Sequence, residues 1–308
     1  MYPRFRPLLR LFALLAWLPS APLLAQPFVD LVDFPRNEAN WDRFYTLESH
    51  LASRFDAVCA DTLCEGDYSN LRALQLRCSV NAASGQVHAC NWLFIASELQ
   101  IAADTGMVLS DNRRWDCPLP LGTGVAVEAF HASLERADAL DVVLPGAALS
   151  IGEAVGDCLQ QTRQTRQPER AVSAARYVDA RDYPGPGQGG ARFRALEQAL
   201  VRGFDDICGD TFCEGEYYNL QAMRLRCSVH AASGRVGECR WTFAGSNMNV
   251  DAATGAVTVD ARDWACRLPL ASYTPLPLLL GTLQGQDAID TALPGTRTTV
   301  YEGLTTCL

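Results

Sequence analysis

The chain contains no lysine. All 26 of its basic residues are arginine, and 35 aspartates and glutamates oppose them, which gives a formal net charge of −9 at pH 7. Proteins that bind nucleic acid backbones or anionic lipid surfaces need a surplus of basic side chains. The charge balance therefore argues against both kinds of partner. With only four histidines, no metal-binding histidine pair and no glycine-rich phosphate loop, the sequence predicts neither a metal nor a cofactor.

Long apolar runs are also missing after the first residues. The N-terminus carries Arg4, Arg6 and Arg10, then the short apolar run LFALLAWL, then small residues up to Ala25. This order predicts a secretory signal peptide over residues 1–25, because the run is shorter than the roughly 20 residues of a spanning helix. Cleavage would remove three arginines and no acid, changing the charge from −9 to −12. We expect an exported protein, periplasmic or extracellular, without a membrane span after cleavage.

No CxxC motif occurs, although the chain has twelve cysteines, all beyond residue 25. Structural zinc sites usually show such close cysteine pairs. An even number of cysteines in an exported chain instead favours disulfide bonds.

The cysteines reveal an internal repeat. Each of the first six has a counterpart 149 residues later, and aromatic residues such as Phe44 and Trp92 follow the same offset. We interpret residues 43–159 and 192–308 as two modules. An N-terminal extension covers residues 26–42 and a polar linker covers residues 160–191. FVDLVDF at 28–34 and ARYVD at 175–179 could each add a strand to a module edge.

Periodicity predicts one fold for both modules. An apolar stripe with helical spacing is formed by Phe44, Leu47, Leu51, Phe55 and Val58. Segments in which apolar and polar residues alternate then predict an antiparallel meander whose first turn is centred on Ser84. Helical spacing of the apolar residues returns near the end of the module. The predicted class is α+β, with helix, antiparallel β-meander and C-terminal helices in that order. The opening helix and meander resemble cystatin-like folds, and the turn VDAATGAV is similar to one in PepSY domains; neither resemblance assigns residue roles.

Six cysteines allow 15 pairings in each module. A hairpin centred on Ser84 places Cys78 opposite Cys90, a geometry that suits a bridge. The other pairs follow partly by elimination. The favoured set is Cys59–Cys64, Cys78–Cys90 and Cys117–Cys158, with Cys208–Cys213, Cys227–Cys239 and Cys266–Cys307 in the second module.

The stretch CADTLCEGDYSN at 59–70 returns as CGDTFCEGEYYN at 208–219. An EF-hand is excluded because Leu63 and Arg72 occupy positions that need oxygen ligands. Glu65 with Asp67 could form an acid–base pair for glycoside hydrolysis, but neighbouring carboxylates in a tight loop rarely straddle a sugar. Recurring acids, tyrosines, asparagines and arginines are the candidate binding residues: Glu65, Asp67, Tyr68, Asn70, Arg77, Arg113, Glu214, Glu216, Tyr217, Asn219, Arg226 and Arg262.

These observations favour an exported, non-enzymatic binding protein, although its ligand is not identified. The partner would be an extracytoplasmic protein, a glycan or a small molecule, and an inhibitor of an extracellular enzyme is one version. One alternative is a hydrolase that uses the acids of the CEGD and CEGE loops. Another is a structural component of the cell envelope. No catalytic residue is assigned.

Overall fold

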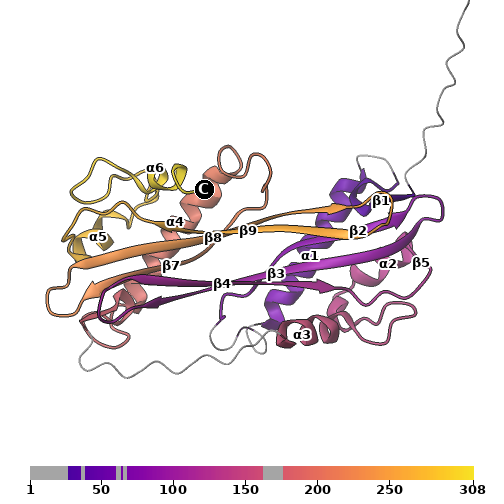
Figure 1. Ribbon diagram of the computed structural model, residues 1–308, viewed down its shortest axis with the longest axis horizontal. Coiled ribbons are helices and arrows are strands. Elements are labelled where there is room, and N and C mark those ends of the chain that lie inside the picture. Colours follow the sequence, from indigo (N-terminus) through magenta and orange to yellow (C-terminus); the bar gives the residue numbers. More distant parts are fainter. Residues whose placement is uncertain (1–26, 36–38, 60–63, 65–67, 162–175) are drawn as a thin grey trace, which may run out of the picture.

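The structure is a computed structural model of the 308-residue chain, and it describes residues 27–35, 39–59, 64, 68–161 and 176–308. The predicted signal peptide lies outside the described residues, as do Glu65 and Asp67. The fold is mixed α and β with two antiparallel sheets, as the periodicity predicted. Figure 1 shows the long strands running along the molecule, with one set of helices at each end.

The N-terminal half, residues 27–161, forms the first sheet and its helices. Its strands have the order β1-β2-β3-β4, and β5 adds to β3. In chain order the elements are β1 (Phe28–Asp30), the 3-10 helix η1 (Leu31–Asp33), α1 (Ala39–Cys59), β2 (Arg72–Asn81), β3 (Gln86–Ile101), β4 (Val108–Pro118), β5 (Val125–Ala126), α2 (Val127–Leu134), the 3-10 helix η2 (Ala139–Asp141) and α3 (Ile151–Gln161).

The C-terminal half, residues 176–308, forms the second sheet, with the order β6-β7-β8-β9. Its elements are β6 (Tyr177–Asp179), the 3-10 helix η3 (Ala180–Asp182), α4 (Gly190–Cys208), β7 (Gln221–His230), β8 (Val236–Val250), β9 (Val257–Arg267), α5 (Leu276–Thr282) and α6 (Val300–Thr305). β1 and β6 are the two edge strands that FVDLVDF and ARYVD suggested.

Local sequence explains the long helix and the hairpin of each half. In α1 the side chains of Phe44, Leu47, Leu51 and Phe55 are buried, because their spacing aligns them along the side of the helix that packs on the sheet. In the following hairpin Cys78 lies directly opposite Cys90. The structure contains six disulfides, which are the six pairs named above, and every one lies within a single half.

The two sheets pack against each other through the faces that do not carry helices. A small apolar cluster joins Leu74, Leu93 and Ile95 of the first sheet to Met223 and Met248 of the second. Polar groups cross the same boundary. The buried hydroxyls of Ser97 and Thr242 are 2.8 Å apart, and Arg224 Nη1 pairs with Glu98 Oε2 at 2.8 Å. The halves therefore share an interior in addition to their own cores.

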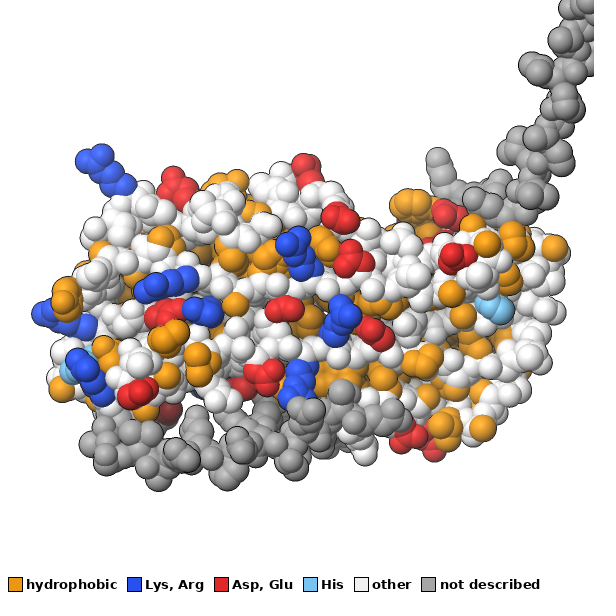
Figure 2. Space-filling view, in the orientation of Figure 1, with side chains coloured by type: hydrophobic (Ala, Val, Ile, Leu, Met, Phe, Trp, Pro, Cys, Tyr) orange, Lys and Arg blue, Asp and Glu red, His pale blue; other side chains and the backbone are white. Residues whose placement is uncertain are grey.

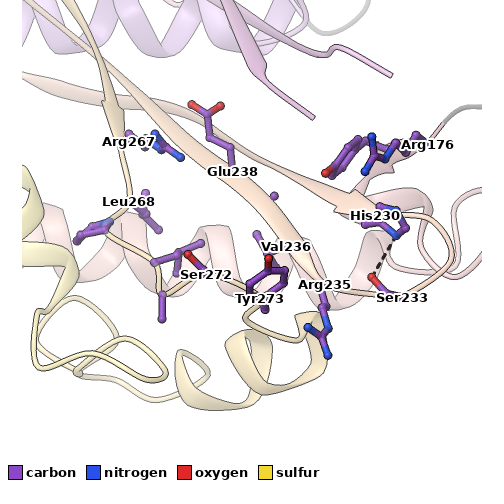
Figure 3. A pocket seen from close by; sticks show the side chains of 15 residues that line it. Arg176, His230, Ser233, Arg235, Val236, Glu238, Arg267, Leu268, Ser272 and Tyr273 are labelled. Carbon is purple, nitrogen blue, oxygen red and sulfur yellow. Dashed lines mark hydrogen bonds between the residues drawn. The ribbon is translucent and has the colours of Figure 1, made fainter. Parts of the chain in front are cut away.

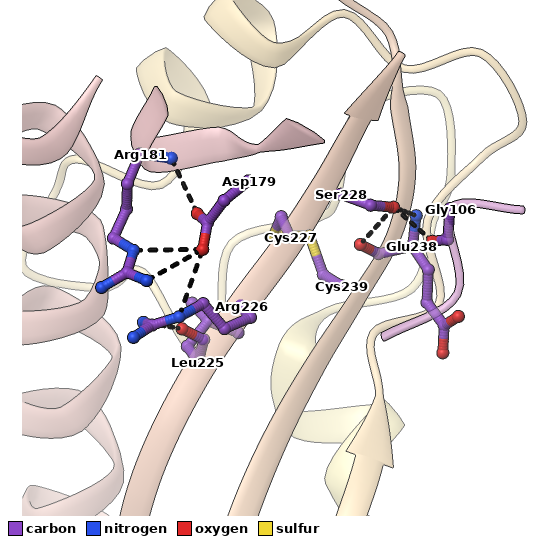
Figure 4. Close-up of a disulfide and its surroundings, with 9 residues drawn as sticks. All are labelled: Gly106, Asp179, Arg181, Leu225, Arg226, Cys227, Ser228, Glu238 and Cys239. Atoms are coloured by element: carbon purple, nitrogen blue, oxygen red, sulfur yellow. Dashed lines mark hydrogen bonds and ion pairs between the residues drawn. A yellow bond between two sulfur atoms is a disulfide. The ribbon is translucent and has the colours of Figure 1, made fainter. Parts of the chain in front are cut away.

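The β3–β4 and β8–β9 turns reach across this boundary and hold the opposite half. Ser228 Oγ donates a hydrogen bond to the carbonyl oxygen of Gly106 at 2.5 Å, as Figure 4 shows, and Ser79 Oγ donates to that of Gly255 at 2.6 Å. Both glycines have a left-handed backbone, with φ of 76° and 73°. A Cβ on Gly106 would lie 2.6 Å from the Tyr177 ring, so the close approach needs glycine.

Candidate anion-binding pocket

Several residues that the sequence singled out form a surface cluster in each half. Tyr68 Oη donates to Asp111 Oδ2 at 2.6 Å, and the tyrosine ring meets Trp115 edge-on at 5.8 Å. The Arg113 guanidinium lies 5.3 Å from the centre of the Tyr68 ring. Aromatic and cation–π contacts of this kind hold the loop before β2 on the sheet. The structure thus brings Tyr68 and Arg113 together.

The C-terminal half repeats this cluster with small differences. Tyr217 Oη donates to Asp260 Oδ2 at 3.0 Å and its ring meets Trp264 at 5.6 Å, but Arg262 lies over Trp264 instead of over the tyrosine. Glu214 and Glu216, in the loop before this tyrosine, are exposed.

Arg77 and Arg226 belong to a different environment, because both are buried in the sheets. Arg77 Nη1 lies 3.4 Å from Asp30 Oδ2, and Arg226 Nε lies 3.3 Å from Asp179 Oδ2. Figure 4 shows the second pair, with Arg181 bound to the same carboxylate. Burial lowers the pKa of Arg226 to about 10. Both arginines connect an edge strand to the sheet.

Asn70 and Asn219 fix the start of the strands that follow them. The Oδ1 atom of Asn70 accepts from the Ser97 amide at 3.1 Å, and that of Asn219 accepts from the Ser246 amide at 2.8 Å. Asn219 also donates to the carbonyl oxygen of Leu74 in the other half at 3.2 Å. The predicted residues that the structure describes therefore occupy several environments and do not line one shared cleft.

A pocket that the sequence analysis did not identify lies in the C-terminal half, at the start of β8 and the end of β9. Its volume is about 810 Å³. Figure 3 shows Glu238 and Arg267 toward one side, Arg176, His230 and Ser233 toward the other, and Tyr273 between them. The remaining lining residues are Tyr177, Arg235, Val236, Gly237, Leu268, Pro269, Leu270, Ala271 and Ser272.

Three arginines dominate the charge of this pocket. Arg176, Arg235 and Arg267 are all exposed, and none forms an ion pair with a carboxylate in the part of the chain that the structure describes. Two of them contact aromatic rings. Arg176 lies 5.8 Å from the centre of the Tyr177 ring, and Arg235 lies 5.2 Å from that of Tyr273. Their charges remain available to a ligand.

The pocket's one carboxylate is already engaged. Glu238 is buried, and its Oε1 accepts from Arg240 Nη2 at 2.7 Å. Its Oε2 accepts from the amide of Val108 in β4 at 3.2 Å. Because Arg240 balances this negative charge, the three pocket arginines are not neutralised by it. Figure 2 shows basic side chains gathered at the end of the molecule where α5 lies.

The corresponding place in the N-terminal half lacks this chemistry. Counting back 149 residues, the three arginines become Pro27, Gln86 and Pro118. Gly237 becomes His88, whose ring packs 4.5 Å from that of Phe28. At these positions the C-terminal half thus carries three cations and the N-terminal half carries none. Reasoning from recurring residues missed the pocket for this reason, because its arginines occur in one half only.

Comparison of the chain with protein-family models, with curated proteins and with solved structures found no match.

Over the described residues, no helix is both long and apolar enough to cross a membrane. In the same residues, no cluster of three or more histidine, cysteine, aspartate or glutamate side chains could hold a metal ion.

Proposed function

We propose that this chain is an exported binding protein whose C-terminal half captures a small acidic molecule in the arginine-lined pocket. The observation that carries the proposal is the set of three arginines that face one cavity without a carboxylate partner among the described residues. Guanidinium groups donate several hydrogen bonds in a plane and bind carboxylates or phosphates in pairs. In a chain of net charge −9, such a local surplus of positive charge favours an anionic ligand.

The contrast between the halves supports the same reading. If we take the 149-residue offset as the trace of a duplication, the shared positions maintain the fold and the positions that differ are free to carry function. Arg176, Arg235 and Arg267 all fall in the second group, and they lie around one cavity. Scattered surface arginines would have no reason to coincide in this way.

Binding without turnover fits the state of Glu238. A general base needs a carboxylate that can reach a proton of the substrate. Both oxygens of Glu238 already accept hydrogen bonds, from Arg240 and from the Val108 amide. Export fits the six disulfides, which persist in oxidising compartments.

Isothermal titration with a panel of organic acids and matched neutral compounds tests the proposal. We expect the native protein to bind acids, with an affinity that falls as salt is added. A variant with Arg176→Gln, Arg235→Gln and Arg267→Gln should lose at least about tenfold in affinity, or about 1.4 kcal/mol. The control replaces Arg192, Arg202 and Arg297, which are exposed elsewhere in the same half, and so removes the same charge.

Equal weakening in the two triple variants would mean that only net charge matters, and the pocket would then not be a site. The absence of binding to every acid in the panel would likewise contradict the proposal.

A further inference from the structure

One residue at the pocket has a backbone conformation that its side chain disfavours. Tyr273 has a φ of 68°, and it is the only residue other than glycine with a positive φ in the described part of the chain. In this left-handed region the Cβ atom crowds the neighbouring carbonyl oxygen, so glycine is the usual occupant. The position 149 residues earlier is Gly124, with a φ of 81°. The two halves share the backbone shape, but only the first uses the residue that suits it.

The contacts of the Tyr273 side chain within the folded chain add little stability to offset this strain. The residue is 71% exposed, so it buries little apolar surface. None of the described residues forms a hydrogen bond with its hydroxyl, and the Arg235 guanidinium lies 5.2 Å from the centre of its ring. Strained residues that stability does not explain are often found at binding sites. In this case the strained residue lies among three arginines at a cavity.

We infer that Tyr273 contacts the ligand, and that the ligand is a sugar acid. The inference rests on the pocket function proposed above and adds the chemical class. Arg235 approaches the tyrosine ring, and much of the ring remains open to solvent. Because the Arg235 guanidinium lies over one face of the ring, a ligand whose flat, apolar face stacks on the ring would take the other face. A carboxylate on the edge of that ligand would then pair with a pocket arginine at the rim of the ring. The C–H face of a pyranose ring has this shape, and a uronic acid carries the carboxylate on the same ring.

The rest of the pocket suits such a ligand. The hydroxyls of Ser233 and Ser272 line the cavity and could exchange hydrogen bonds with sugar hydroxyls. Arg176 and Arg267 lie toward opposite sides of the cavity, with Tyr273 between them (Figure 3). A second carboxylate on a linked uronate would therefore meet another arginine. A cavity of about 810 Å³ is in the size range of small-molecule sites.

The test compares Tyr273→Gly with Tyr273→Phe in the otherwise native chain, using galacturonate and digalacturonate as probes and galactose as the neutral control. Glycine relieves the strained backbone, so the melting temperature should not fall and should rise by up to about 3 °C. The same change should weaken digalacturonate binding about three- to tenfold, the usual size of a stacking contribution. Phenylalanine keeps the stacking face, so its affinity should stay within about twofold.

The reverse substitution, Gly124→Tyr, provides the matched control in the other half. It introduces the strain without the pocket, so it should lower the melting temperature and leave digalacturonate binding unchanged. Native affinity in Tyr273→Gly would overturn the role of Tyr273 while leaving the acidic pocket intact. Binding of benzoate or another aromatic acid in preference to galacturonate would overturn the sugar-acid assignment. No binding of any acid to the native chain would instead remove the proposed function itself.

Discussion

His131 is an ionisable residue enclosed in the core of the N-terminal half. Its side chain has no exposed surface, and its Nδ1 lies 3.6 Å from Glu135 Oε1. Burial lowers the pKa of the imidazole, and the nearby charge of Arg43 lowers it further. The position 149 residues later is Leu280, also buried, so an apolar side chain suffices at this place in the fold.

We expect His131→Leu to remove part of the acid sensitivity of the protein. Because the folded-state pKa is lowered, the unfolded chain binds the proton first as the pH falls below about 6.5. The free energy of unfolding of the native chain should therefore drop as the pH falls from 6.5 toward the lowered pKa, and the drop should be smaller in the variant. Urea titrations at pH 7.5 and 5.0 measure both. Parallel losses in the two proteins would contradict this role.

At the residue scale, the type of a side chain did not predict its environment in the fold. The sequence makes Arg77 and Arg226 binding candidates because arginine is common at interfaces, yet each is buried against an aspartate of a short edge strand. The aspartates lie 47 residues before these arginines in the sequence, and only the folded sheet brings them together. Tyr273 could not be predicted as a functional residue, because its unusual φ angle is visible only in the folded structure.

Two glycines, one in a turn and one in a helix, show that the effect of a Gly→Ala substitution on stability depends on the element that contains it. Gly106 closes the β3–β4 turn with a positive φ against the Tyr177 ring. Gly156 lies inside α3, and a Cβ added there would have no other atom within 4 Å. The same substitution should therefore have opposite effects at the two positions.

Gly106→Ala should destabilise the protein by at least about 1–2 kcal/mol, because it adds left-handed strain to a steric clash. Gly156→Ala should stabilise it by about 0.5–1 kcal/mol through helix propensity. Urea denaturation of both variants beside the native chain measures the difference. If Gly106→Ala proved neutral, the turn would not be held tightly against the other half.

At the element scale, local patterns predicted the long helix, the hairpin and the meander because these depend on near neighbours in the chain. The packing of one sheet on the other escaped the same reasoning. Gln75 and Ser79 of β2 alternate with Leu76 and Cys78, which is the pattern of a strand with one face in water. In the structure all four are buried, since the polar pair bonds to the second sheet: Ser246 donates to Gln75, and Ser79 donates to Gly255.

At the scale of the whole molecule, we expect the two halves to depend on each other. Separation would expose Leu74, Leu93 and Ile95, which face the second sheet, and would leave Arg224 without Glu98. Residues 26–159 and 176–308, oxidised separately, should therefore associate when mixed, at a ratio of one to one. Size-exclusion chromatography with light scattering measures this. Two separate monomers in the mixture at micromolar concentration would show that the shared interior contributes little.

The placement of the six disulfides has a consequence for biogenesis. Each bond joins cysteines that are 5, 12 or 41 positions apart, and no sulfur atom links residues before 162 to residues after 175. If the chain is exported as proposed, the leading segment can thus complete its three native disulfides before the trailing segment has been synthesised. Only the non-covalent docking of the two segments then remains for the last strands, because the native partner of every thiol lies within its own segment.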